Sequence, residues 1–472
     1  MAVPRRQSDA PPVIHSQRTF RIPLGDCMRI SAFVTWTGLA GFAFFCLNSL
    51  HSQTAAPPHR IVIRAARLIT GKGDAVLTNG VIEIEGKRIT AVGSGLAVPA
   101  NAEVIDLGNE TVLPGLIDAH THLLMEMDGS KILQQDAEML RIVATESTAE
   151  RALLGARSAR EDLEAGITTV RDVGNSGVEG DAALRDAIMR GWVPGPRMIV
   201  STRALSAPGG QFGSLTPDAR KLINQEYVVI DGAESARQAV REALYSGANC
   251  IKVIVNGNPA DVTPEEMTAI VQEAHRDGVK VAAHAIGDAE TRIAAEAGVD
   301  SIEHAYIVSD DVLRMMAQKH IFLVPTDSTL SQFIAMVFGG REPTPEERST
   351  FDKEMKDYFE GNRRRLQRAI DLGVPIAAGS DMYATVPGKT RGQASLDVLE
   401  ALSNEGMGSM AIIHAATSSA AELLGLQDRI GTLEPGKLAD IIAVPGNPVD
   451  DITSLEHTTF VMKGGVVIRQ KQ

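Results

Sequence analysis

The sequence predicts an α/β protein in which a (β/α)8 TIM barrel carries a small composite β-sandwich domain formed by both chain ends. Short apolar segments alternate with longer helical patterns, which is typical of βαβ units and a parallel sheet. Eight such strand segments can be counted, the number that closes a barrel of this kind. They are 114–122, 167–173, 197–203, 250–256, 280–285, 301–306, 321–325 and 375–380. Outside this region, alternating apolar residues with turn glycines predict the strands of the second domain.

Two segments between these strands show the helical pattern clearly. Residues 264–278 follow Thr263, a residue type that caps helices, and carry Glu266 at the third position. This spacing is a capping box, and Gly278 then marks the end of the helix. A second apolar-periodic segment covers 288–298. Both are long enough to cross back over a parallel sheet between consecutive strands.

The domain organisation places the barrel between two parts of one small domain. We expect a leader at 1–57, sandwich strands at 58–112, the barrel at 113–425, and the remaining sandwich strands at 426–472. Within the leader, residues 30–47 are an uncharged apolar run followed by a polar stretch, as in a signal peptide. A retained membrane anchor is the alternative, because such a run is about long enough to span a bilayer. We therefore expect a periplasmic or secreted protein that touches a membrane only through an uncleaved leader.

Charge and cysteine content exclude some partners and stabilising devices. The chain of 472 residues has a formal net charge of −13. The leader holds five basic and two acidic residues, a net of +3, so its removal gives −13 − 3 = −16. This acidity argues against a nucleic-acid partner and favours a small-molecule substrate. Of the three cysteines, Cys27 and Cys46 lie in the leader, so Cys250 alone cannot build a disulfide framework.

The first barrel strand ends in LPGLIDAHTHLL, with His120 and His122 one residue apart. Side chains at i and i+2 of a strand point to the same side, so both imidazoles project together. This is a good geometry for holding one metal ion. Alone, however, an H-x-H pair is as consistent with an ordinary surface strand.

Further candidate ligands follow other predicted strands. They are Lys252 in CIKVIVN, His284 in KVAAHAIGD, His304 in SIEHAY and Asp381 after PIAAGS. The reactive residues of a (β/α)8 barrel lie at the carboxyl ends of its strands, and all of these candidates fall at or near such ends. The sequence therefore predicts a metal site at this end of the barrel. Packed histidines, a lysine extending out of a strand end and a helix N-cap at Asp381 are the structural alternatives.

Several motifs, in this order and spacing, resemble the amidohydrolase superfamily. Within it, the chain is similar to the imidazolonepropionase-like branch that includes prolidase-like (Xaa-Pro) and Xaa-Arg or Xaa-Lys dipeptidase-type enzymes. The resemblance covers nearly everything from about residue 60 onward, in IVIRAARLITGKGD, LPGLIDAHTH, AGITTVRDVG, IEHAY, GSD and RIGTLEPGKLADIIAV. It implies the same barrel flanked by a β-sandwich from both chain ends. Many relatives carry Gly-Gly-His where this chain has Gln211 after two glycines, which argues against a substrate assignment that depends on that histidine.

The resemblance also implies two divalent metal ions. His120, His122 and Asp381 would hold one ion, and His284 and His304 the other. Lys252 would bridge the two ions as a carboxylated lysine, and a buried lysine can lose its proton and react as a nucleophile. Imidazole and carboxylate ligands favour zinc, with manganese, cobalt or iron as alternatives. Asp381 would act as the general base and pass its proton to the leaving amine.

Substrate selection in such barrels is built in the loops after the strands. We expect Arg203, Gln211, Tyr227 and Tyr306 to contact the substrate, because they lie in these loops or just past a ligand. The expected reaction is hydrolysis of an amide bond in a dipeptide or N-acyl amino acid. A cyclic-amide hydrolase or aminohydrolase of the same fold is the first alternative, and a non-catalytic barrel that only binds its ligand is the second. A homo-oligomer is left open.

Overall fold

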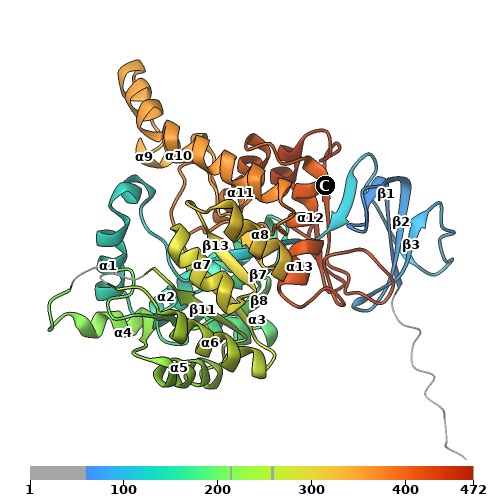
Figure 1. Cartoon of the computed structure of the whole chain (residues 1–472). Helices are drawn as coiled ribbons and strands as arrows, with labels where there is room; N and C mark the ends of the chain where they lie inside the picture. Colours follow the sequence, from blue (N-terminus) through green and yellow to red (C-terminus); the bar gives the residue numbers. More distant parts are fainter. Residues whose placement is uncertain (1–59, 213–214, 257–259, 471–472) are drawn as a thin grey trace, which may run out of the picture. The chain divides into compact units, whose positions relative to one another are not determined.

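The structure is a computed structural model that describes residues 60–212, 215–256 and 260–470 (Figure 1). The leader predicted at 1–57 lies outside these ranges. Within them, no helix is both long enough and apolar enough to cross a bilayer. The described chain contains a parallel-stranded barrel and a second, mostly antiparallel sheet.

The parallel strands form two hydrogen-bonded groups. One group contains β6, β7 and β8, and the other runs in the order β10-β9-β11-β12-β13-β14. Their bounds are β6 Leu116–Thr121, β7 Ile167–Asp172, β8 Arg197–Val200, β9 Ala204–Ser206, β10 Tyr227–Val229, β11 Cys250–Ile254, β12 Lys280–Ala285, β13 Ser301–His304 and β14 Phe322–Val324. The two groups meet where Asn249 N donates to Val200 O at 2.9 Å, just before β11. Seven of the eight predicted segments therefore contain a barrel strand.

The eighth predicted strand, 375–380, differs from the prediction. The segment contains no regular strand, and within it only Ile376 makes an isolated bridge, to Leu323 of β14. Its other edge contacts β6, where Ala119 N donates to a carbonyl of the segment at 2.9 Å. Pro375 has no N–H to contribute to a strand ladder, which explains the irregular pairing at the start of the segment. The segment still closes the barrel, because it bonds to both neighbouring strands.

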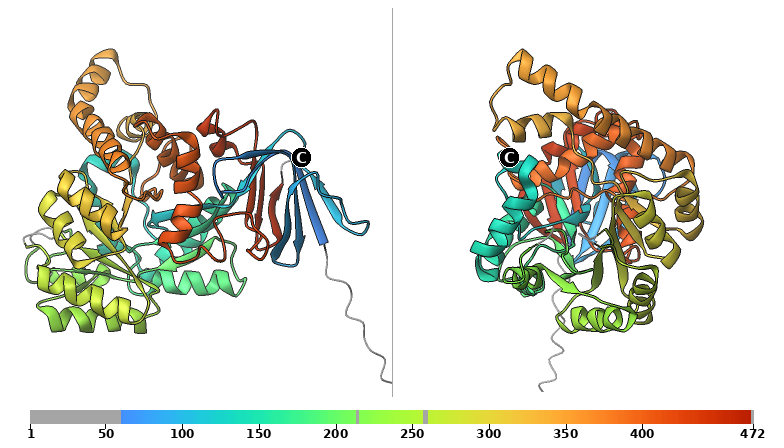
Figure 2. Two further views of the ribbon diagram at one scale, coloured as in Figure 1. Left: turned by 45° about the vertical axis from the view of Figure 1, so that its right-hand side comes forward. Right: turned by 60° about the vertical axis from the view of Figure 1, so that its left-hand side comes forward.

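Helices pack around the outside of the strands, as Figure 2 shows. The helices that follow or flank barrel strands are α2 Thr148–Glu164, α3 Gly180–Met189, α5 Ala233–Tyr245, α6 Pro264–Arg276, α7 Asp288–Ala297, α8 Asp310–Lys319, α11 Arg391–Asn404, α12 Ser409–Ala415 and α13 Ser418–Leu423. The capping box predicted for α6 is confirmed, because Thr263 and Glu266 each accept a hydrogen bond from the other's backbone N–H. Apolar side chains of these helices and of the strands form one large core.

Two chain segments stand apart from the regular βα pattern. After β6 come the 3-10 helix η1 Gly129–Gln134 and α1 Gln135–Thr145, and after β14 come α9 Leu330–Val337 and the long α10 Pro345–Asp371. Smaller elements are η2 Arg220–Leu222, α4 Ile223–Glu226 and η3 Ile452–His457. Ile132 from η1 and Phe333 from α9 pack against one apolar cluster, so these two segments support each other.

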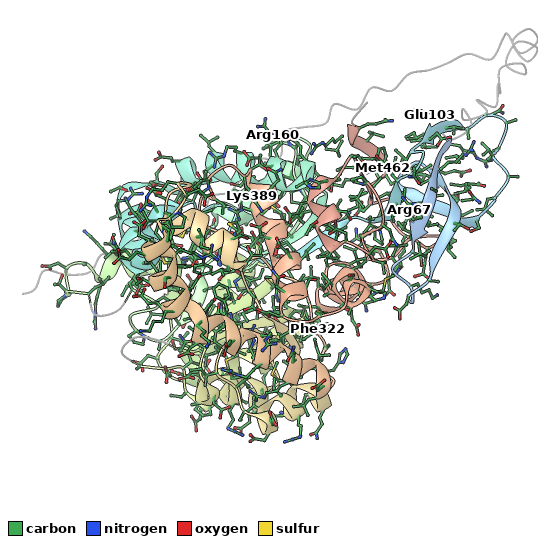
Figure 3. All side chains as sticks on the ribbon, turned by 90° about the horizontal axis from the view of Figure 1, so that it is seen from above. Arg67, Glu103, Arg160, Phe322, Lys389 and Met462 are labelled. Carbon is green, nitrogen blue, oxygen red and sulfur yellow. The ribbon has the colours of Figure 1, made fainter. Side chains whose placement is uncertain are left out.

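Strands from both chain ends form one eight-stranded sheet, in the order β17-β16-β15-β5-β1-β2-β3 with β4 paired to β1. The bounds are β1 Arg60–Ile69, β2 Val76–Glu85, β3 Arg88–Ser94, β4 Glu103–Asp106, β5 Thr111–Pro114, β15 Ile441–Val444, β16 Phe460–Lys463 and β17 Val466–Gln470. Ile63, Ile82, Ile441 and Phe460 belong to its shared apolar core. Arg67, labelled in Figure 3, donates to Gly446 O at 3.1 Å and so links the two chain ends. The composite domain predicted from the sequence is confirmed.

Candidate metal centre

Three of the predicted ligands converge at the carboxyl ends of β6 and of the segment 375–380. The Nε2 atoms of His120 and His122 lie 3.4 and 3.1 Å from Asp381 Oδ1. One ligand atom of each residue lies within 4.8 Å of the others, close enough for one ion to bind all three. Burial alone would raise the pKa of Asp381, but His120 and His122 outweigh it and hold this pKa well below its ordinary value. The carboxylate is therefore ionised.

Both imidazoles are oriented by acceptors on their other ring nitrogen. His122 Nδ1 donates to Gly174 O at 2.8 Å, and His120 Nδ1 lies 2.6 Å from Glu303 Oε2. In the neutral ring, an acceptor at Nδ1 places the single proton there and leaves the Nε2 lone pair free for a metal, whereas the protonated ring donates from Nε2 to Asp381. A hydrogen-bond acceptor at the ring nitrogen that does not face the metal is the arrangement expected for metal-binding histidines.

Glu303 is fully buried and sits in a network of charged and polar groups. Arg171 Nη2 donates to Glu303 Oε1 at 2.9 Å, and Ser301 Oγ donates to the same oxygen at 2.5 Å. Burial alone would raise the pKa of Glu303, but Arg171 and then His120 lower it further than burial raises it. Glu303 therefore stays ionised and increases the basicity of His120 as a ligand.

Replacing Glu303 with glutamine is expected to weaken metal binding by roughly 10- to 100-fold, the usual effect of losing a partner behind a ligand. The change also leaves the buried charge of Arg171 without its counter-charge, which typically costs about 3–5 kcal/mol of stability. Metal titration and thermal unfolding of the same samples measure both effects. Glu266→Gln is the matched control, because Glu266 is buried in the cap of α6 and does not line the cavity. Unchanged metal affinity in Glu303→Gln would refute the role assigned to Glu303.

The second predicted pair, His284 and His304, lies beside the first group. Their ring centroids are 4.5 Å apart, and the His304 and His120 centroids are 5.2 Å apart. Thr326 Oγ1 donates to Pro325 O, so it can only accept from His304 Nδ1, at 2.7 Å. His304 Nε2 therefore carries a lone pair. Burial, followed by the charge on Lys252, lowers the pKa of His284 to about 3, so this imidazole is neutral as well.

Lys252 is buried in β11, next to the strand that carries His284. Burial lowers the pKa of its ammonium to about 8, although Glu303 and Asp381 raise it in part. Lys252 lines the cavity, and among the described residues no carboxylate forms an ion pair with its ammonium. A neutral amine at this position is therefore accessible near neutral pH, which suits a lysine that reacts with carbon dioxide.

Asp118 holds together the two backbone segments that carry the ligands. Ser380 donates to its carboxylate from N at 2.9 Å and from Oγ at 2.6 Å, and His120 N donates to it at 3.1 Å. Asp381 N in turn donates to His120 O at 2.7 Å. Asp381 has a φ of 48°, a conformation that non-glycine residues rarely adopt. The network around Asp118 stabilises this strained backbone in place.

A second support reaches the site from α10. Arg365 Nη1 donates to His304 O at 2.5 Å, and Arg365 also pairs with the buried Asp327. Its guanidinium lies over the ring of Tyr306, 5.4 Å from the centroid. His304 has a φ of 74°, which breaks the alternation of β13. Glu303 and His304 can therefore both reach the site although they are neighbours in sequence.

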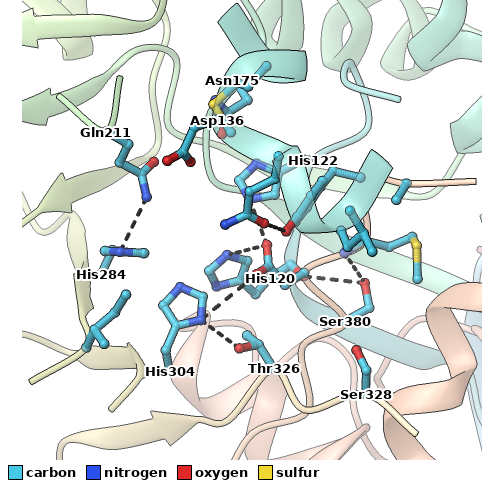
Figure 4. A pocket seen from close by; sticks show the side chains of 18 of the residues that line it. His120, His122, Asp136, Asn175, Gln211, His284, His304, Thr326, Ser328 and Ser380 are labelled. Carbon is cyan, nitrogen blue, oxygen red and sulfur yellow. Dashed lines mark hydrogen bonds and ion pairs between the residues drawn. The ribbon is translucent and has the colours of Figure 1, made fainter. Parts of the chain in front are cut away.

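A cavity of about 730 Å³ opens above these residues (Figure 4). Gln211, Tyr227 and Tyr306 line it, as predicted for substrate contacts. Gln211 Nε2 lies 3.3 Å from His284 Nε2, and Tyr227 donates to Gln211 Oε1 at 3.1 Å. These side chains connect the ligand histidines to the space where a substrate would lie.

Arg203 was predicted with these residues, but it does not line this cavity. Arg203 Nη1 donates to Asn224 O at 3.0 Å, and Nη2 pairs with Glu242 of α5 at 2.6 Å. The prediction for Arg203 rested on its place in a loop after a strand, where substrate selection is built in barrels. Thr202 adopts a φ of 58° immediately before Arg203, so the chain turns there and the alternation of strand side chains no longer applies.

Several cavity residues were missed in the sequence. Some are polar, namely Gln135, Asp136, Asn175 and Tyr383, and others form an apolar side from η1, α1, α9 and α10. Glu303 could have been found, because it directly precedes a candidate ligand at the end of a buried strand. The apolar side carried no such signal, since its residues read as ordinary amphipathic helix.

The comparisons agree with this geometry. The sequence matches the Amidohydrolase family over residues 111–469. It is 31% identical to ochratoxinase of Aspergillus niger over 440 residues, covering 86% of each chain. Imidazolonepropionase of Geobacillus kaustophilus is 28% identical over 429 residues, covering 83% of this chain and 91% of that protein. The crystal structure of a Xaa-Pro dipeptidase with bound methionine is similar, with a TM-score of 0.72, 30% identity, and coverage of 87% of this chain and 100% of that one. The chain is therefore a C–N hydrolase and belongs to the amidohydrolase family.

Proposed function

We propose that this protein is an exported, binuclear metal-dependent hydrolase that cleaves an amide bond in a dipeptide or N-acyl amino acid. The observation that carries the proposal is the convergence of the predicted ligands at the floor of one cavity. Similarity to a Xaa-Pro dipeptidase and to ochratoxinase supports this substrate class. The proposal of export rests on the apolar run at 30–47. N-terminal sequencing of the mature protein from a cell fraction tests it.

The donor set fits two divalent ions, and we propose zinc. His120, His122 and Asp381 offer one site, and His284 and His304 offer donors for a second, with Lys252 between them as a carboxylated lysine. When bound, the ions would polarise the scissile carbonyl and activate the attacking water. Lys252 favours this arrangement over a single-ion cyclic-amide hydrolase or aminohydrolase, because it lines the cavity beside His284 and His304, where a carboxylated lysine would lie between the two sites.

The side chains have separate roles in hydrolysis, namely proton transfer, orientation of the candidate ligands and substrate binding. Asp381, ionised and at the floor of the cavity, accepts the proton of the water and delivers it to the leaving nitrogen. Glu303 and Gly174 keep His120 and His122 in the tautomer that binds. Gln211 and Tyr227 offer an amide and a hydroxyl to the polar atoms of the substrate. Asp381 thus carries the proton released when water attacks the carbonyl to the amine that departs.

Elemental analysis of the purified, zinc-supplemented protein is expected to give about two transition-metal ions per chain, because the donor set serves two sites. Amide hydrolysis by this sample should be lost on treatment with a chelator and should return on adding zinc. A screen against dipeptide and N-acyl amino acid libraries measures the substrate class. Full activity at about one ion per chain would refute the bridged site. Tight ligand binding without turnover of any amide or cyclic amide would instead indicate a binding protein.

A further inference from the structure

The lining of the cavity has two unlike parts. The ligand residues and Gln211 form one part of the lining, and large apolar side chains from η1, α1, α9 and α10 form another. Some of these segments also contribute polar lining residues, namely Gln134, Gln135, Asp136 and Gln332. We call the large apolar side chains the apolar wall, made of Ile132, Leu133, Met139, Phe333, Met355 and Tyr358. Its residues come from η1, α1, α9 and α10, the segments that stand outside the regular βα pattern. The apolar wall is therefore a part of the cavity that the barrel itself does not provide.

Charge is nearly absent from the cavity outside the ligand set. Among the described lining residues, Asp136 is the one further acidic side chain, and Lys252 is the one lysine, with no arginine beside it. Asp136 lies near Asn175 and Gln211, as Figure 4 shows. A charged substrate group placed against the six side chains of the apolar wall would lose water without gaining a counter-charge from them. The wall therefore disfavours charged substrate groups.

Aromatic rings form a continuous path from the metal centre into the apolar wall. The His304 and Tyr306 ring centroids are 5.6 Å apart, those of Tyr306 and Tyr358 are 5.8 Å apart, and those of Tyr358 and Phe333 are 5.9 Å apart. Tilted and edge-to-face contacts at these distances are favourable and fix ring orientation. Arg365 packs over Tyr306 and so holds the start of the path. A flat substrate group can extend this series of rings.

Exposure of the apolar wall supports an apolar ligand. Leu133 is 69% exposed, although it is a large apolar side chain on the lining of the cavity. Met139, Phe333, Met355 and Tyr358 are only partly buried. Methionine side chains adapt to differently shaped apolar ligands. A bound apolar group would remove this surface from water, which provides the driving force for binding.

We propose that the apolar wall binds a large uncharged group of the substrate, an aromatic ring system or a bulky branched alkyl group on one side of the scissile amide. This rests on the proposed function and narrows its substrate class. The enzyme then prefers dipeptides and N-acyl amino acids with such a group over those with a small or charged group. In an apolar pocket, two substrates that differ by one methylene group typically differ in kcat/KM by roughly 10- to 200-fold.

Two substrate series test the preference. In one, the acyl group changes from acetyl to benzoyl to 2-naphthoyl on one amino acid. In the other, N-acetyl amino acids carry glycine, phenylalanine, glutamate or lysine. In at least one of the two series, we expect kcat/KM to rise by at least about 10²-fold from the smallest group to the aromatic group. The reason is that the aromatic group makes several more apolar contacts than the smallest group. Equal kcat/KM across both series, or a preference for glutamate or lysine, would overturn the proposal.

Variants of Met355 locate the preference on the apolar wall. Met355 lies on α10 and is partly exposed, so a polar substitution leaves the fold intact. Met355→Lys and Met355→Glu are expected to lower the ratio of kcat/KM for the aromatic substrate to kcat/KM for the acetyl-glycine substrate by about 10- to 100-fold. Met355→Leu keeps the apolar surface and should keep the preference. Lys353→Glu, on the exposed face of α10, is the matched charge control and should behave as wild type.

A binding measurement separates this inference from the proposed function. The zinc-loaded protein is titrated with the neutral aromatic amide 2-naphthamide, followed by its fluorescence. We expect binding in wild type and in Lys353→Glu, and at least about tenfold weaker binding in both charged Met355 variants. If no substrate turns over but this pattern holds, the amidase proposal fails while the apolar subsite stands. If Met355→Lys and Met355→Glu bind 2-naphthamide as wild type does, the apolar subsite is refuted.

Discussion

Replacing Asp381 with asparagine is expected to lower kcat by a factor of about 10² to 10⁴, the usual contribution of a general base. The amide has nearly the same shape, but it cannot accept the proton of the attacking water. The loss can be larger, because Asp381 also lies within reach of His120 and His122 as a ligand. Steady-state kinetics and metal content measured on one sample separate the two effects.

Asp162→Asn is the matched control for this substitution. Asp162 is fully buried, lies in α2 and does not line the cavity. Burial raises the pKa of Asp162 to about 7, so a neutral amide resembles the state that the group often adopts. This control should keep both its metal content and its kcat. An Asp381→Asn enzyme with full metal and near-normal kcat would place the base elsewhere.

Replacing Lys252 with alanine is expected to reduce kcat/KM by at least about 10²-fold, with a parallel loss of metal, because a bridging ligand disappears. Formate or propionate, supplied together with zinc, should restore part of the activity by placing a carboxylate in the vacated space. Metal content and kcat/KM, measured with and without these acids, follow the rescue. A crystal structure of the wild-type enzyme should show density beyond Lys252 Nζ.

Lys280→Ala is the control for charge removal. Lys280 begins β12, pairs with Asp300 at 2.8 Å and does not line the cavity. It should keep its metal and show no response to formate. Arginine or methionine at position 252 with normal turnover would contradict the bridging role, because neither side chain can be carboxylated.

The barrel was predictable because its strands are buried on both faces. Such strands read as short apolar runs, and seven of the eight predicted runs contain a barrel strand. The segment 375–380 has the same composition, but it begins with a proline, which cannot donate to a strand ladder. Composition alone does not distinguish an extended segment that closes a barrel from a regular strand.

The convergence of the candidate ligands was predictable because barrel topology brings strand ends together. His120, His122 and Asp381 come from distant parts of the sequence, yet they meet within bonding distance of one ion. Arg203 shows the limit of this rule, since one left-handed residue before it redirects its side chain to Glu242. The apolar wall could not be predicted, because no local sequence pattern shows that the helices inserted after β6 and β14 line a cavity.

The joining of both chain ends in one sheet also has a consequence for synthesis. Pro114 of β5 pairs with Ile441 of β15, a separation of 441 − 114 = 327 residues. At a synthesis rate of about 5–20 residues per second, roughly 15 to 65 s pass between the synthesis of β5 and that of β15. During this time its edge stays open to pairing with other chains. A nascent chain halted before β15 is therefore expected to be the most aggregation-prone form of this protein, and solubility should appear only when the last three strands have been made.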